Sequence, residues 1–120
     1  MGSQRVLIVD DDPSVREIIA AVLRREGLIV DLAGDGQEAV RALNSREYGT
    51  VLLDLLMPLV GGEGVIAYMR SNDIRTPVIV ITGHSDAHPR LDSDVVQLVM
   101  QKPIEMRDLR DVVCTVLRTV

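Results

Sequence analysis

The chain has 120 residues, a net charge of −5 and a single cysteine, Cys114. This length suits one domain with a core of its own, and the absence of a Lys/Arg block argues against direct contact with nucleic acid. Because one cysteine allows no internal disulfide, and neither an export signal nor an apolar run of about 18 residues is present, the sequence predicts a cytoplasmic location and no membrane contact.

Five short aliphatic runs predict five β-strands. In chain order they cover residues 5–9, 29–32, 50–53, 77–81 and 95–100. The last run is weaker because Gln97 interrupts it. The first, third and fourth runs are almost continuously apolar, which is typical of strands that are buried on both faces of a parallel sheet.

Helical patterns lie between these runs. The first stripe follows helical spacing and consists of Val15, Ile18, Ile19, Val22 and Leu23. Asp12 is its predicted N-cap, Pro13 its first helical residue and Gly27 its stop. Further stripes cover residues 39–43, 65–69 and 109–117. This alternation of strands and helices predicts right-handed βαβ units and a doubly wound α/β sheet.

Polar residues follow the predicted strands at their carboxyl ends. They are Asp10, Asp11, Asp54, Thr82 and Lys102. Ligands of such sheets bind beyond the carboxyl ends of the strands, so we expect these side chains to form one cluster. Three neighbouring carboxylates repel one another, and a hard divalent cation such as Mg²⁺ relieves that repulsion.

The cluster fits phosphoryl transfer to a carboxylate. Asp10 and Asp11 would hold the metal, and Asp54 would serve both as a ligand and as the nucleophile that becomes an acyl phosphate. The Thr82 hydroxyl and the Lys102 charge would meet the incoming phosphoryl oxygens, since such transfers depend mainly on positioning and charge neutralisation. Each residue alone could be a cap, a loop acid or a surface side chain, so the interpretation depends on their combination.

Four stretches carry a resemblance to a known family: VLIVDDDP, LLDLLMPLVGG, VIVITG and QKPI. Through them the sequence resembles the receiver domain of two-component response regulators over essentially the whole chain. The resemblance implies a single receiver domain over residues 1–120. It also implies a flavodoxin-like, doubly wound, five-stranded parallel sheet with strand order 2-1-3-4-5.

The resemblance assigns roles to the cluster. It implies that Asp54 accepts a phosphoryl group from a histidine kinase or a histidine phosphotransfer protein. It implies that Mg²⁺, or another divalent cation such as Mn²⁺, is held by Asp10, Asp11, Asp54 and the main-chain carbonyl of Leu56. Thr82 and Lys102 would contact the phosphoryl group. In this family the bond after the lysine is usually a cis Lys–Pro bond, so we expect a cis bond after Lys102.

Two departures from the family pattern concern the conformational switch. Val99 stands where the family usually has an aromatic residue that reports the switch. Residues 83–94, GHSDAHPRLDSD, form a shorter stretch than usual and lack a helical apolar stripe. Short helices without a packed stripe are marginal in water. We therefore expect the fourth helix of the fold to be short, irregular or missing.

Three functions fit these observations. The first is a phosphoacceptor signalling domain that is not an enzyme beyond catalysing its own phosphorylation and dephosphorylation. It would signal by a conformational change, to a downstream effector or within a homodimer. The second is a degenerate receiver that serves as a protein-interaction scaffold. The third is a Mg²⁺-dependent phosphatase with an aspartyl nucleophile, in which a second acid would stand where this chain has Leu56.

Overall fold

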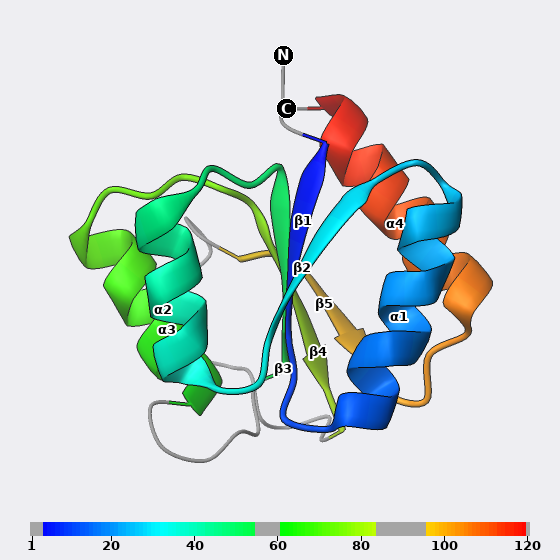
Figure 1. Ribbon diagram of the computed structural model, residues 1–120, viewed down its shortest axis with the longest axis horizontal. Helices are drawn as coiled ribbons and strands as arrows, with labels where there is room; N and C mark the ends of the chain where they lie inside the picture. The colour runs from blue at the N-terminus through cyan, green and yellow to red at the C-terminus, as the bar shows by residue number, and fades with distance from the viewer. Residues whose placement is uncertain (1–3, 55–60, 84–95, 120) are drawn as a thin grey trace.

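The computed structural model describes residues 4–54, 61–83 and 96–119, and their strands form one parallel sheet (Figure 1). The strands are β1 (Arg5–Val9), β2 (Ile29–Ala33), β3 (Thr50–Asp54), β4 (Val78–Thr82) and β5 (Val96–Gln101). Their order in the sheet is β2-β1-β3-β4-β5, and every neighbouring pair is parallel. The predicted strand order and doubly wound topology are confirmed.

Helices cover both faces of the sheet. They are α1 (Pro13–Arg25), α2 (Gly36–Ser45), α3 (Gly61–Ser71) and α4 (Met106–Thr119). In Figure 1, α2 and α3 lie on one face, and α1 and α4 lie on the other. Within the described residues, no helix is long and apolar enough to cross a membrane.

The core divides into two halves because alternate strand residues face opposite sides of the sheet. Along β1, Leu7 and Val9 belong to the half beneath α2 and α3. Val6 and Ile8 belong to the half beneath α1 and α4. All four are buried. Continuous apolar runs therefore indicated strands with two buried faces correctly.

The start and end of α1 follow the prediction. The Asp12 carboxylate accepts hydrogen bonds from the main-chain N–H groups of Ser14, at 2.9 Å, and Val15, at 3.4 Å. Pro13 is the first helical residue, and Gly27 follows the helix with φ +83°. That left-handed backbone favours glycine, which explains why the helix ends there.

The predicted apolar stripe of α1 was wrong at one residue. Ile18 is 54% exposed, whereas Ile19, Ala20 and Leu23 are buried. Ile18 lies on the flank of the buried stripe, roughly 100° around the helix from Ile19. The stripe is therefore narrower than the sequence suggested.

The strands β2, β3, β4 and β5 each end one residue beyond the predicted apolar run, and for β3 and β4 the added residue is a functional candidate. β3 ends at Asp54 and β4 ends at Thr82, so both polar residues belong to the sheet ladder. Asp54 pairs in register with Ile81, and Thr82 pairs with Gln101. Main-chain pairing thus holds both functional candidates at the carboxyl edge of the sheet. The helix expected to be short, irregular or missing belongs to residues 83–94, between β4 and β5. Of these residues, 84–94 lie outside the described part of the chain.

Candidate functional site

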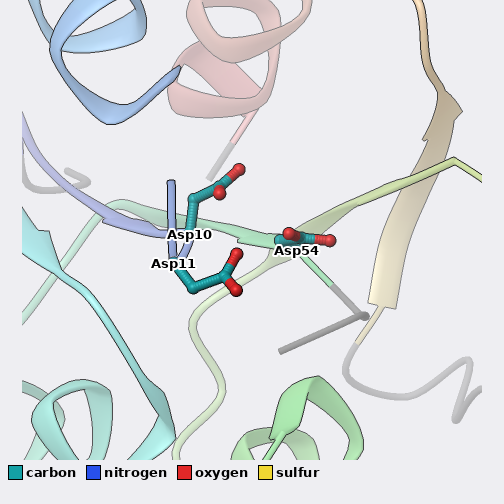
Figure 2. A group of neighbouring side chains, drawn as sticks. All are labelled: Asp10, Asp11 and Asp54. Atoms are coloured by element: carbon teal, nitrogen blue, oxygen red, sulfur yellow. The ribbon is translucent and has the colours of Figure 1, made fainter. Parts of the chain in front are cut away.

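Three carboxylates meet at the carboxyl edge of the sheet. Asp10 and Asp11 directly follow β1, and Asp54 ends the neighbouring strand β3. Figure 2 shows the three side chains gathered around one space. One oxygen from each of them lies within 4.8 Å of the others. Asp10 and Asp54 are buried, while Asp11 is exposed, so solvent reaches the cluster on the Asp11 side.

Local hydrogen bonds hold Asp10 in place. Its main-chain N–H donates to the Ala33 carbonyl at 3.1 Å, which continues the β1–β2 ladder past the end of the strand. Its carboxylate accepts from the Asp12 N–H at 2.9 Å. The turn that leads into α1 therefore fixes both the backbone and the side chain of this aspartate.

Lys102 brings a positive charge to the same edge from β5. Its Nζ lies 3.8 Å from Oδ2 of Asp10 and 3.9 Å from Oδ2 of Asp54. Its main-chain N–H donates to the Thr82 carbonyl at 2.8 Å, which keeps the end of β5 beside the end of β4. The Lys102–Pro103 peptide bond is cis, as expected.

Thr82 is fully buried at the end of β4. Val99 pairs with Val80, two residues before Thr82, so Val99 and Thr82 belong to the same face of adjacent strands. Val99 is partly buried against the half of the core beneath α2 and α3. An aliphatic side chain therefore occupies the packed position next to the predicted phosphoryl contact.

The residues fit a divalent cation of the Mg²⁺ type. The donors are carboxylate oxygens, which hard cations prefer. Three carboxylates and one ammonium carry a formal charge of −3 + 1, or −2, which a divalent cation balances. Lys102 and a bound divalent cation would together suit a phosphoryl group, whose oxygens need positive charge around them.

The structure brings most of the predicted site residues together. Asp10, Asp11, Asp54, Thr82 and Lys102 all lie at the carboxyl edge of the sheet. Leu56, whose main-chain carbonyl is the remaining predicted ligand, lies outside the described residues.

The sequence reasoning missed Arg16. Its Nη1 donates to the Asp10 main-chain carbonyl at 2.7 Å. One signal could have found it: Arg16 is a cation near the N-terminus of α1, where the helix dipole disfavours positive charge. Such a residue indicates a partner beyond the helix.

Comparison with known proteins gives consistent matches. Residues 6–114 match a family model described as the response regulator receiver domain. The DNA-binding response regulator MtrA of Mycolicibacterium smegmatis is 40% identical over 83 residues, which are 69% of this chain and 36% of MtrA. TcrA of Mycobacterium tuberculosis, a transcriptional regulatory protein, is 34% identical over 72% of this chain and 34% of its own length. The chain thus matches about a third of the length of these relatives.

Solved structures are similar over nearly the whole chain. TrrA, a response regulator of Thermotoga maritima in complex with Mg²⁺ and BeF, is 30% identical with a TM-score of 0.84, covering 97% of this chain and 99% of that one. The receiver domain of a sensor histidine kinase of Pseudomonas aeruginosa is 26% identical with a TM-score of 0.85, covering 98% and 99% of the two chains. In that structure a magnesium ion is coordinated in the active-site cleft.

Proposed function

The chain belongs to the response regulator receiver domain family, and from this premise we propose that Asp54 accepts a phosphoryl group from a histidine kinase or a histidine phosphotransfer protein. One observation carries the proposal. Asp54 is a buried carboxylate at a strand end that shares a 4.8 Å cluster with two other carboxylates and lies 3.9 Å from an ammonium. We also propose that residues 1–120 form one receiver domain.

Asp10, Asp11 and Asp54, together with the Leu56 carbonyl, would hold Mg²⁺ or a similar cation such as Mn²⁺. The metal would supply positive charge to the phosphoryl oxygens when it is bound. Support comes from the oxygen donors and from the formal charge of the cluster. The three acids contribute −3 and Lys102 contributes +1, which leaves −2 for the cation to balance. The magnesium in the Pseudomonas receiver and in TrrA supports the same assignment by similarity.

The side chains would divide the transfer between them. An Asp54 oxygen would bond to phosphorus while the phosphorus–nitrogen bond of the phosphohistidine breaks and the imidazole nitrogen keeps the electron pair. Lys102 would move its ion pair from the two carboxylates to a phosphoryl oxygen, and the Thr82 hydroxyl would donate to another. Burial of Asp54 would limit the access of water to the acyl phosphate, so its hydrolysis would be slow.

Receiver domains are signalling modules, and we propose that this one turns over no separate substrate. It would catalyse its own phosphorylation and dephosphorylation and act on a downstream effector or a second copy of itself. MtrA is named a DNA-binding protein, but this chain matches 36% of it and carries a net charge of −5. We therefore propose no direct contact of this chain with nucleic acid. The cytoplasmic location stays a prediction.

The test is phosphorylation by a small donor. Incubation with Mg²⁺ and acetyl phosphate should add one acid-stable, base-labile phosphoryl group, and Asp54→Asn should abolish it. Asp111→Asn is the matched control, because Asp111 is an exposed acid on α4 that pairs with Arg110. Phosphorylation that persists in Asp54→Asn would refute the assignment.

Two further measurements separate the alternatives. Failure to bind Mg²⁺ and beryllofluoride would favour the scaffold. Sustained hydrolysis of a generic phosphate ester would favour the phosphatase.

A further inference from the structure

We propose that Arg16 is a positioning residue for the metal site, acting through the main-chain carbonyl of Asp10. The inference rests on the proposed function, because it concerns the geometry of the carboxylates that would hold the cation. Arg16 lies on α1, and its Nη1 donates to the Asp10 carbonyl at 2.7 Å. Hydrogen bonds from a charged donor are among the stronger ones in proteins.

The Asp10 carbonyl controls the direction of the next residue. The carbonyl lies in the peptide plane that joins Asp10 to Asp11, and that plane is rigid. Fixing it therefore fixes the position of the Asp11 Cα, from which the Asp11 side chain extends toward the cluster. Asp11 is the exposed member of the cluster, so it lacks the packing that holds Asp10 and Asp54.

Gly34 leaves space for the Arg16 guanidinium because it has no side chain. A Cβ atom at Gly34 would lie 2.9 Å from Nη1 of Arg16 and 3.2 Å from Oε1 of Glu38. The first distance is shorter than real Cβ contacts, so any side chain at this position would displace the guanidinium. The Gly34 N–H in turn donates to Oε1 of Glu38 at 2.5 Å. The turn between β2 and α2 thus has a residue without a side chain where the Arg16 guanidinium lies.

The charge of Arg16 and its hydrogen bond predict opposite changes in Mg²⁺ affinity when Arg16 is replaced. Arg16 is a cation close to the candidate cation site, so its charge alone should weaken Mg²⁺ binding. Removing that charge would then strengthen binding. If Arg16 instead keeps the carboxylates in place, removing it should weaken binding, because Mg²⁺ demands near-ideal octahedral geometry. The sign of the change distinguishes the two effects.

The experiment measures Mg²⁺ affinity by calorimetry, at a temperature where each variant is shown to be folded. Arg16→Met keeps an unbranched stem and removes the donor, and it should weaken Mg²⁺ binding by about ten-fold, the low end for partners outside the ligand shell. Arg16→Lys keeps a donor and the charge and should recover part of the loss. Arg25→Met is the matched control, since Arg25 is exposed in the last turn of the same helix. Its affinity should equal that of the wild type.

A double-mutant cycle tests the close approach of the Arg16 guanidinium to Gly34. Gly34→Ala should weaken Mg²⁺ binding in the wild-type background, because the new methyl group displaces the guanidinium. It should have a smaller effect in the Arg16→Met background, where the closer of the two contacts, the one to Nη1, is gone and only the contact to Oε1 of Glu38 remains. Such non-additivity is expected only for residues that act through one contact. If Arg16→Met does not fold, Arg16→Lys and Gly34→Ala still provide the test.

The outcomes separate this inference from the proposed function. Unchanged or tighter Mg²⁺ binding in folded Arg16→Met would overturn the positioning role. If the melting temperature fell while the affinity stayed unchanged, Arg16 would stabilise the fold without positioning the metal site. Both results would leave the metal site itself intact. If the wild type did not bind Mg²⁺, or if Asp11→Asn bound it equally well, the proposed metal site would fail and the inference with it.

Discussion

The Nζ of Lys102 lies 3.9 Å from Oδ2 of Asp54, so the ammonium is already beside the proposed phosphoacceptor before any phosphoryl group arrives. Lys102 is the only lysine among the 13 basic residues of the chain, and the other 12 are arginines. A lysine ammonium is a compact point charge that can move between partners more freely than a planar guanidinium. The position thus suits a cation that exchanges a carboxylate for a phosphoryl oxygen.

Replacing Lys102 with alanine should separate metal binding from the phosphorylation response. Mg²⁺ affinity should rise by about three-fold, because a competing cation leaves the carboxylates. Binding of beryllofluoride should fall sharply, because the phosphoryl mimic loses its counter-charge. The Lys102 side chain is 38% exposed, so the stability of the metal-free protein should fall by less than about 1 kcal/mol. Calorimetry and urea unfolding measure these changes, and a loss of Mg²⁺ affinity would show that Lys102 instead organises the carboxylates.

Neutralising one acid of the cluster should stabilise the metal-free protein while weakening the metal site. Asp54→Asn removes a buried charge from among three carboxylates, and we expect a gain on the order of 1 kcal/mol in the free energy of unfolding. Saturating Mg²⁺ should reverse the order, because the wild type then gains binding energy that the variant lacks. Urea unfolding with chelator and with Mg²⁺ tests both halves. A variant less stable than the wild type in chelator would contradict the repulsion argument.

Much of the fold could be predicted because it depends on patterns that repeat along the chain. The run at residues 5–9 became β1 without a shift, since alternate residues of a strand in a parallel sheet meet apolar neighbours on both sides. The apolar pattern predicted the ends of β3 and β4 one residue too early. Main-chain pairing does not depend on side-chain polarity, so Asp54 and Thr82 continue the ladder.

The polar contacts between different elements were harder to predict. The bond from Arg16 to the Asp10 carbonyl joins a side chain to the main chain across a turn, and no spacing rule marks it. A bond between Tyr48 and Asp31 spans 17 residues and joins the loop before β3 to the edge strand β2. Contacts of this kind depend on the finished packing, which the apolar pattern does not specify.

The orientation of α1 allows a matched comparison of two neighbouring isoleucines. Ile19→Ala should cost about 3 kcal/mol, because Ile19 is 3% exposed and its loss leaves a cavity in the core. Ile18→Ala should change the stability by less than about 0.5 kcal/mol, because Ile18 is 54% exposed. Urea unfolding of both variants measures the difference. Equal costs would mean that the buried stripe of α1 is broader than the structure shows.

Arg5, Asp31 and Tyr48 form a polar network away from the candidate site. The Tyr48 hydroxyl donates to Oδ2 of Asp31 at 2.7 Å, and Nη1 of Arg5 lies 3.1 Å and 3.0 Å from the two carboxylate oxygens. Burial raises the pKa of Asp31, but the hydrogen bonds from Tyr48 and Arg5 and the charge of Arg5 outweigh it and hold the pKa below its usual 3.8. Burial raises the pKa of Tyr48, and its bond to Asp31 and the charge of Asp31 raise it further, to about 12.

These opposite shifts predict how stability depends on pH. The lowered pKa of Asp31 contributes stability above pH 3.8, and this stability is lost as the pH falls through the folded-state value. The raised pKa of Tyr48 contributes stability below pH 10, and this is lost as the pH rises toward about 12.

Tyr48→Phe should therefore cost about 1 kcal/mol at pH 7. Its deficit should shrink toward pH 11.5, because above pH 10 Tyr48 ionises in the unfolded wild type and so favours unfolding, whereas the variant has no phenol to ionise. Its acid unfolding should begin at higher pH, since Asp31 loses a donor. Tyr68→Phe is the control, because that exposed hydroxyl lies 3.5 Å from Asn44 and makes only a long bond. A Tyr48→Phe deficit that stayed constant from pH 7 to pH 11.5 in urea unfolding would contradict the coupling between the two residues.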